Sequence, residues 1–159
     1  MRILLVGAGG VGSAFVAIAA RRDFFETIVV ADYSLERAEK AAAADSRYAA
    51  AQLDASSADA VAALCREHRI THVMNAVDPV FNMPIFDGAF AAGADYLDMA
   101  MSLSKPHPEA PYEKTGVKLG DDQLAKSDPE TRSNLHVVAA LLGHRGSHES
   151  ALRAAKFLA

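Results

Sequence analysis

The sequence has little cysteine, no surplus of basic residues and no apolar run long enough to cross a membrane. Its single cysteine, Cys65, cannot form an intramolecular disulfide, and the apolar Val61 and Leu64 beside it indicate a small buried core residue. The 16 Lys and Arg residues are outnumbered by 20 Asp and Glu residues and form no basic stripe that could neutralise a phosphate backbone. We therefore expect neither nucleic acid nor a membrane as a partner.

The first residues also lack the apolar length of a secretory signal, because the run at residues 3–6 reaches glycine at position 7. We therefore expect a cytoplasmic protein. Hydrophobic residues make up 51% of the 159 residues and charged residues 23%, which is typical of a folded protein. This length suits one domain and leaves too little sequence for a second domain with a core of its own.

Short apolar runs alternate with segments of helical spacing as far as residue 100. The runs predict strands at residues 3–6, 27–31, 49–53, 72–77 and 96–100, and residues 11–22 have the spacing of the first helix. Further helix signals are Ser34 as an N-cap, Ser56 and Asp59 as a capping box, Pro84 in a first turn and Gly93 at a C-terminal stop. This alternation predicts an α/β fold with a doubly wound parallel sheet, the three-layer Rossmann fold.

The sequence G-A-G-G-V-G at residues 7–12 lies between the first predicted strand and the first predicted helix. In a dinucleotide fingerprint, the first glycine permits the tight turn, the second lets a pyrophosphate approach the backbone, and the third lets helix and strand pack closely. The alternative is a turn that needs glycine only for its positive φ angles. We predict that a nicotinamide dinucleotide binds over Gly7, Gly9, Gly10, Val11 and Gly12.

Asp32 ends the second predicted strand about 20 residues after Gly12, where an acid accepts hydrogen bonds from the adenosine ribose. A carboxylate there repels a 2′-phosphate, so the sequence favours NAD. Arg37 follows shortly and could meet a 2′-phosphate, so NADP stays possible. Without a cofactor, Asp32 would be only a polar residue at a strand end.

Other candidates follow the third and fourth predicted strands. Asp54 either contacts the adenine or is an acid before a helix, and the sequence leaves both interpretations open. Asn75, Ala76 and Val77 fall at the carboxyl end of the fourth strand, where ligands gather in open α/β sheets. We predict that these small residues leave room for the nicotinamide ribose, the alternative being a strand that simply ends at the turn of Asp78.

The run N-A-V-D-P at residues 75–79, followed by F-N-M-P-I-F-D-G-A-F-A-A-G-A-D-Y-L-D-M-A at residues 81–100, resembles saccharopine dehydrogenase-like proteins. With V-G-A-G-G-V-G and V-V-A-D, the resemblance covers residues 1–122. It implies NAD- or NADP-linked oxidation of a secondary amine in an amino acid, or the reverse condensation. It also implies that Asp78, Tyr96 and Asp98 lie on the substrate side, although a buried tyrosine and a strand-end acid are alternatives. The catalytic residues stay unassigned.

We divide the chain into a dinucleotide-binding domain at residues 1–122 and a carboxyl-terminal extension at residues 123–159. In the extension, residues 135–142 resemble a buried strand or helix and residues 147–159 a terminal amphipathic helix. His144 and His148 are four residues apart but lack further ligands, so no metal is expected. Four methionines are interpreted as core residues that fill gaps: Met74, Met83, Met99 and Met101.

The resemblance implies that such proteins continue into a large substrate and dimerisation domain, of which residues 123–159 carry no motif. Two hypotheses follow. The chain is the cofactor half of an oxidoreductase, to which an amino-acid substrate binds only if a substrate domain is supplied. Alternatively, it is a non-catalytic module that binds or senses a nucleotide, or a truncated remnant. A homo-oligomer is possible in either case.

Overall fold

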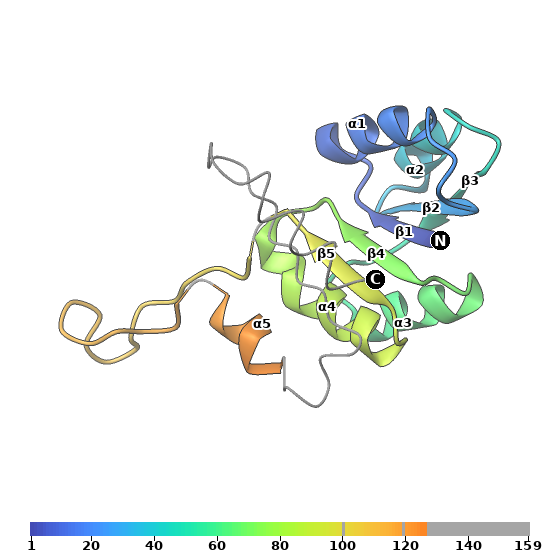
Figure 1. The fold of residues 1–159 in the computed structure, drawn as a ribbon. Helices are drawn as coiled ribbons and strands as arrows, with labels where there is room; N and C mark the ends of the chain where they lie inside the picture. Colours follow the sequence, from blue (N-terminus) through green and yellow to red (C-terminus); the bar gives the residue numbers. More distant parts are fainter. Residues whose placement is uncertain (100, 119, 127–159) are drawn as a thin grey trace, which may run out of the picture.

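The computed structural model describes residues 1–99, 101–118 and 120–126, in which five strands alternate with helices (Figure 1). The strands are β1 (Arg2–Val6), β2 (Thr27–Asp32), β3 (Tyr48–Gln52), β4 (His72–Asn75) and β5 (Asp95–Asp98). The helices are α1 (Gly10–Ala19), α2 (Leu35–Ala42), α3 (Ala58–Glu67), α4 (Asn82–Ala91) and α5 (Asp121–Lys126), with a short 3₁₀ turn, η1 (Pro79–Phe81).

All five strands are parallel, and their order in the sheet is β3-β2-β1-β4-β5. β1 lies at the centre, where Leu5 pairs with Val30 on one side and Met74 on the other. The chain winds outward from β1 to β3, then returns to the opposite side of β1 with β4. The fold is therefore Rossmann-like, as predicted, and its topological switch point lies between β1 and β4.

Helices cover both faces of the sheet, with α1 and α2 on one face and α3 and α4 on the other (Figure 1). Alternation along β1 sorts its side chains between the two layers, because successive residues of a strand point to opposite faces. Leu4 and Val6 pack in the cluster that contains Phe86, whereas Ile3 and Leu5 pack in the cluster that contains Val16. Each fully buried side chain of this size stabilises the fold by roughly 1.5–3 kcal/mol.

Side-chain caps fix where the helices begin. Ser34 caps α2 as predicted, with its Oγ accepting a hydrogen bond from the N–H of Arg37 at 3.4 Å. The cap of α3 is Ser57, one residue after the predicted Ser56, and its Oγ accepts from the N–H of Ala60 at 3.2 Å. Ser56 instead donates its hydroxyl to Asp54 Oδ1 at 2.6 Å, which takes it out of the capping position.

Helix α4 ends before Gly93, whose φ of +69° confirms the predicted stop. β4 ends at Asn75, two positions before its predicted end at Val77. The cause is local, because the N–H of Val77 donates to Oδ1 of Asn75 at 3.0 Å and leaves the strand ladder. Met83 and Met74 both pack against the core as predicted, and Met74 also lines an open groove on the sheet face.

Cys65 is a buried core residue of α3, as predicted, with 1% of its surface exposed. Burial raises the pKa of its thiol to about 11, so it stays protonated at neutral pH. In the part of the chain that the structure describes, no helix is long and apolar enough to cross a membrane, and no three potential metal ligands gather. The elements predicted at residues 135–142 and 147–159, with His144 and His148, lie outside the described residues.

Candidate functional site

The glycine loop joins β1 to α1 and lies against the residues that follow β4. Gly7 has a φ of +103°, and a Cβ atom there would lie 2.5 Å from Val77 Cγ1 and 3.0 Å from the carbonyl oxygen of Ala76. A Cβ atom on Gly12 would lie 1.8 Å from the carbonyl oxygen of Gly7. The packing of the chain itself therefore requires glycine at positions 7 and 12, and it holds the ends of β1 and β4 together at the switch point.

Gly9 and Gly10 differ from these two glycines because the space beside them is open. A Cβ atom at either position would have no heavy atom within 4 Å among its non-neighbours. Gly9 caps α1 without a side-chain hydrogen bond, and the first N–H groups of a helix have no acceptor inside it. Space, free donors and the positive end of the helix dipole together fit the pyrophosphate of a dinucleotide.

Asp32 ends β2 and ties the glycine loop to that strand. Its Oδ2 accepts a hydrogen bond from the N–H of Ala8 at 2.8 Å, and its Oδ1 accepts one from the N–H of Ser34 at 2.9 Å. The Arg37 guanidinium donates to the same Oδ1 from Nη2 at 2.7 Å and from Nε at 3.1 Å. Burial acts to raise the pKa of Asp32, but these donors outweigh it and hold the pKa below its ordinary value. Asp32 is therefore a carboxylate at neutral pH.

A cavity of about 210 Å³ opens at the carboxyl ends of the strands, beside this carboxylate. It is lined by residues that follow four of the strands: Gly7, Asp32, Tyr33, Arg37, Leu53, Asp54, Ala55, Val77 and Phe81, with Val6 at its base. Asp54 is exposed at its edge, and hydrogen bonds from the hydroxyl and the N–H of Ser56 lower its pKa. The cavity is smaller than a pocket for a whole drug-sized ligand, so it suits one part of a dinucleotide.

A buried polar network lies between the end of β4 and α4. Asn75 is 1% exposed, and its Nδ2 donates to Asn82 Oδ1 at 2.8 Å and to the Tyr96 hydroxyl at 2.9 Å. Its Oδ1 accepts the N–H of Val77 at 3.0 Å. The side chain of Asn75 thus fixes the position of Val77, which packs against Gly7, without itself lining the cavity.

Asp98 is likewise 1% exposed, and it is covered by α5. Its Oδ2 accepts a hydrogen bond from Gln123 Nε2 at 2.6 Å, while Gln123 Oε1 accepts the N–H of Ser102 at 2.7 Å. The buried Oδ1 of Asp98 has no hydrogen-bond partner among the described residues. Burial raises the pKa of Asp98, against hydrogen bonds with Gln123 and Tyr96 that act to lower it, and burial likewise raises the pKa of Tyr96.

This burial predicts a pH dependence of stability for Asp98. A raised pKa means that the folded chain holds the proton more tightly than the unfolded chain, so the contribution of Asp98 is favourable at low pH and is lost as pH rises above 3.8. The variant Asp98→Asn carries no charge. Its free energy of unfolding, measured by urea denaturation with circular dichroism, should therefore rise relative to the unmodified chain between pH about 4 and about 7.

The matched control is Asp54→Asn, because the pKa of Asp54 is lowered rather than raised. Its contribution is fully present above 3.8 and is lost only as the pH falls below that value, so this variant should be less stable than the unmodified chain by an amount that stays constant between pH about 4 and about 7. Equal pH dependence in both variants would show that Asp98 carries no buried charge.

The structure brings Gly7, Asp32, Asp54 and Val77 together around one cavity. The three substrate-side candidates are not gathered there. Asp78 is exposed and caps η1, with its Oδ1 accepting the N–H of Val80 at 3.0 Å, whereas Tyr96 and Asp98 are buried behind β4. Sequence reasoning missed the lining residues Tyr33, Leu53 and Phe81, of which only Tyr33 had a signal, its place directly after the acid of β2. It also missed Gln123, for which no local pattern exists.

An open parallel sheet with a glycine loop at its switch point and an ionised acid after β2 defines a dinucleotide-binding Rossmann domain. The sequence matches the family described as the saccharopine dehydrogenase NADP binding domain over residues 3–141. The chain therefore belongs to this family, and the description names a nicotinamide dinucleotide as its ligand. This match extends beyond residue 122, where the region with recognisable motifs of the family ends.

Two examples represent the solved structures that share the fold. The first is apo saccharopine dehydrogenase (L-Glu forming) from Saccharomyces cerevisiae, with a TM-score of 0.60 and 18% identity over 86% of this chain and 26% of the yeast chain. The second is UDP-glucose-4-epimerase from Stenotrophomonas maltophila with bound NAD, with a TM-score of 0.58 and 17% identity over 86% of this chain and 51% of the epimerase. The chain thus spans about a quarter and about a half of these proteins. No curated protein matches the chain.

Proposed function

We propose that this chain is the cofactor-binding part of an oxidoreductase that acts on the secondary amine of an amino acid. The observation that carries the proposal is the open space beside Gly9 at the uncapped start of α1, in a chain of this family. The yeast relative is a saccharopine dehydrogenase, and saccharopine is such a secondary amine. The proposal extends that chemistry to the present chain.

Different residues would contact different parts of the cofactor. The backbone of Gly9, Gly10 and Val11 would hold the pyrophosphate, and Asp32 would accept hydrogen bonds from the adenosine ribose through Oδ2, to which Ala8 alone donates within the described part of the chain. Ala76 and Val77 would border the nicotinamide ribose. The bound nicotinamide supplies or accepts the hydride, while the chain binds and orients it.

For the cofactor choice, we propose that NAD(H) is preferred over NADP(H), and that Arg37 keeps the preference small. The Asp32 carboxylate is ionised and lines the cavity, so it repels a 2′-phosphate. Arg37 partly neutralises this charge through its ion pair with Asp32, and 61% of its side chain is exposed. Its remaining N–H groups are therefore free to approach a phosphate.

Opposite effects of two substitutions test this arrangement. Asp32→Asn keeps an oxygen for the N–H of Ala8 but removes the charge, so the ratio of the Kd of NADPH to that of NADH should fall about tenfold, or about 1.4 kcal/mol. Arg37→Gln leaves the carboxylate unneutralised, so the same ratio should rise by a similar factor. Both Kd values are measured by the fluorescence of the reduced nicotinamide.

Arg66→Gln is the control, because it makes the same change of charge as Arg37→Gln at a residue of α3, behind the opposite face of the sheet, that does not line the cavity of Asp32. It should leave the ratio within about twofold of the unmodified value. Tighter binding of NADPH than NADH by the unmodified chain would refute the NAD preference. Movement of the ratio in the same direction in both test variants would refute the ion pair as its cause.

A non-catalytic module that binds a nucleotide is the second candidate. The observation in its favour is the burial of Tyr96 and Asp98, which leaves these two substrate-side candidates without access to the cavity. Titration with NADH and NADPH, followed by turnover assays with amino-acid substrates in both directions, separates the two functions. Binding together with turnover supports the oxidoreductase, whereas binding without turnover in a complete assembly supports the module.

A further inference from the structure

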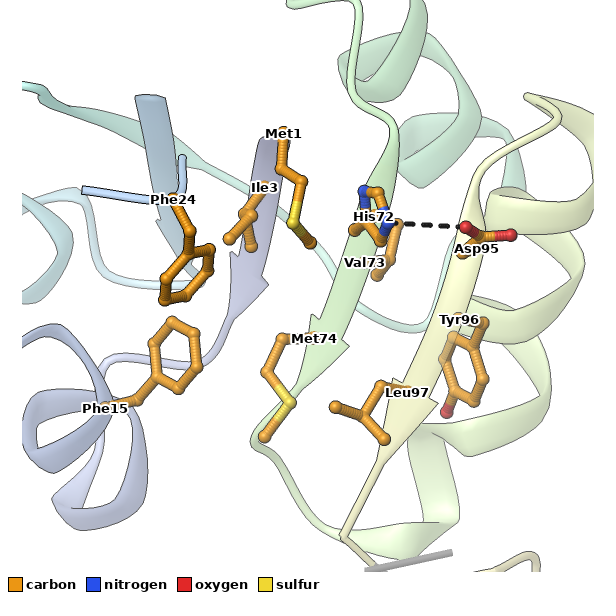
Figure 2. A pocket seen from close by; sticks show the side chains of 10 residues that line it. All are labelled: Met1, Ile3, Phe15, Phe24, His72, Val73, Met74, Asp95, Tyr96 and Leu97. Atoms are coloured by element: carbon orange, nitrogen blue, oxygen red, sulfur yellow. Dashed lines mark ion pairs between the residues drawn. The ribbon is translucent and has the colours of Figure 1, made fainter. Parts of the chain in front are cut away.

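A second, larger cavity lies on the face of the sheet and has no part in the dinucleotide site. Its volume is about 430 Å³, and it extends across β1, β4 and β5 as a groove (Figure 2). Met74 and Leu97 point into the groove from the sheet, and Phe15 and Phe24 border it on the side of α1. Tyr96 also lines it, but its ring packs edge-on against Phe86, toward the other layer.

Among the described residues, the helices of this face cover only part of the sheet, and the groove lies over the remainder. α1 and α2 pack over β1, β2 and β3, whereas β4 and β5 are covered on the opposite face by α3 and α4 (Figure 1). His72 and Asp95 lie at the amino ends of β4 and β5, with Nε2 and Oδ2 3.3 Å apart. Since these polar groups satisfy each other, the remainder of the groove presents apolar side chains.

This apolar face needs a covering layer. Phe24 is 56% exposed and Met1 48% exposed, and Met74 and Leu97 are only half-buried, although strands of a parallel sheet are normally covered on both faces. Covering apolar surface stabilises a fold by roughly 25 cal/mol for each Å² removed from water. Of the sequence outside the described elements, residues 135–142 form the most apolar segment, with seven apolar residues among eight.

We propose that residues 135–142 cover this groove as a helix of the same chain. Leu135, Val138, Ala139 and Leu142 have the spacing i, i+3, i+4 and i+7, which places four apolar side chains on one face of a helix. The family match extends to residue 141, so this segment belongs to the same domain as the sheet. The proposal does not depend on the dinucleotide, because the groove reaches the amino ends of the strands and the cofactor cavity lies at their carboxyl ends.

The connection is long enough. Helix α5 is held at the carboxyl end of β5 by the bond of 2.6 Å between Gln123 and Asp98, and residues 127–134 link it to the segment. Eight residues span at most roughly 26–29 Å. The segment must pass the edge strand β5 and move about 10 Å from the sheet to its covering layer, which is within this reach.

Disulfide trapping in the full chain tests the proposal. Met74→Cys is combined in turn with Val138→Cys and with Val137→Cys, two identical changes at positions about 100° apart around the proposed helix, of which only Val138 lies on its groove-facing side. After mild oxidation, the pair with Val138→Cys should form an intramolecular disulfide with a yield at least about fivefold above that of the pair with Val137→Cys. The reason is that the two Cβ atoms must approach to about 4 Å for the bond to form. Cys65 is buried and does not compete. Non-reducing electrophoresis and mass spectrometry of linked peptides give the yield.

Leu97→Cys with Val138→Cys repeats the test from β5, in case replacement of Met74 disturbs folding, and circular dichroism checks each variant. The control is Ala63→Cys with Val138→Cys, because Ala63 is exposed on α3, behind the other face of the sheet. A disulfide-linked dimer in place of the monomer would assign the groove to a second copy and overturn the proposal. Equal yields at positions 137 and 138, or no intramolecular product from either groove position, would also overturn it.

Discussion

Substitution of Gly9 by Asp should abolish NADH binding, with a Kd raised at least about 100-fold, without a decrease in the melting temperature. The position is open, so the new side chain meets no atom of the chain within 4 Å of its Cβ. It does place a carboxylate at the uncapped start of α1, where the pyrophosphate must approach the N–H groups. Loss of binding then reports a clash with the ligand. Fluorescence titration with NADH and thermal denaturation measure the two quantities.

Two variants separate this effect from others. Ala14→Asp adds the same charge at an exposed position of α1 and should leave the Kd within about threefold of the unmodified value. Gly12→Ala should instead lower the melting temperature, because its Cβ would lie 1.8 Å from the carbonyl oxygen of Gly7. A folded Gly9→Asp chain that binds NADH normally would exclude the glycine loop as the pyrophosphate site.

The strands and the glycine loop could be predicted from the sequence because their signals are local. Residues 3–6 and 27–31 carry continuous apolar runs, and the run of glycines follows the first of them directly. The roles of individual glycines could not be separated in this way. Gly7 and Gly12 are required by contacts with Val77 and with each other, and only the folded backbone shows that Gly9 is free of such contacts.

The polar groups behind the site could not be predicted because their partners are distant in sequence. Asn75 binds Tyr96, and Asp98 binds Gln123, across 21 and 25 residues of sequence. No spacing rule for a helix or a strand relates such pairs. The sequence predicted a strand at residues 96–100, and the structure places it at Asp95–Asp98, so Tyr96 and Asp98 are both strand residues as predicted. Their burial by α4 and α5 depends on how those helices pack. The ion pair between Arg37 and Asp32 could be predicted in part. The two residues are only five apart in sequence, but their contact also depends on where α2 begins, which the cap at Ser34 decides.

The second prediction with a large effect is that residues 1–159 alone bind NADH but do not oxidise saccharopine or a similar secondary amine. Hydride transfer requires the substrate carbon to be held against the nicotinamide, and orientation of this kind supplies roughly 7–11 kcal/mol of the barrier. The described residues offer one wall for such a cleft, the carboxyl ends of β1 to β4. Tyr96 and Asp98 are each 1% exposed, so they contact no substrate in this arrangement. The expected rate is the uncatalysed background.

The change in NADH absorbance at several chain concentrations measures this rate, with Gly9→Asp as the control that lacks cofactor. A substrate-dependent rate that is proportional to chain concentration and lost in the control would contradict the prediction and would make this chain a complete catalyst. Sedimentation of the same samples identifies whether a second copy closes the cleft. If turnover appears only when a separate substrate domain is added, the orientation that this chain lacks is supplied by that domain. The nucleotide site of residues 7–12 would then be one half of a shared active site.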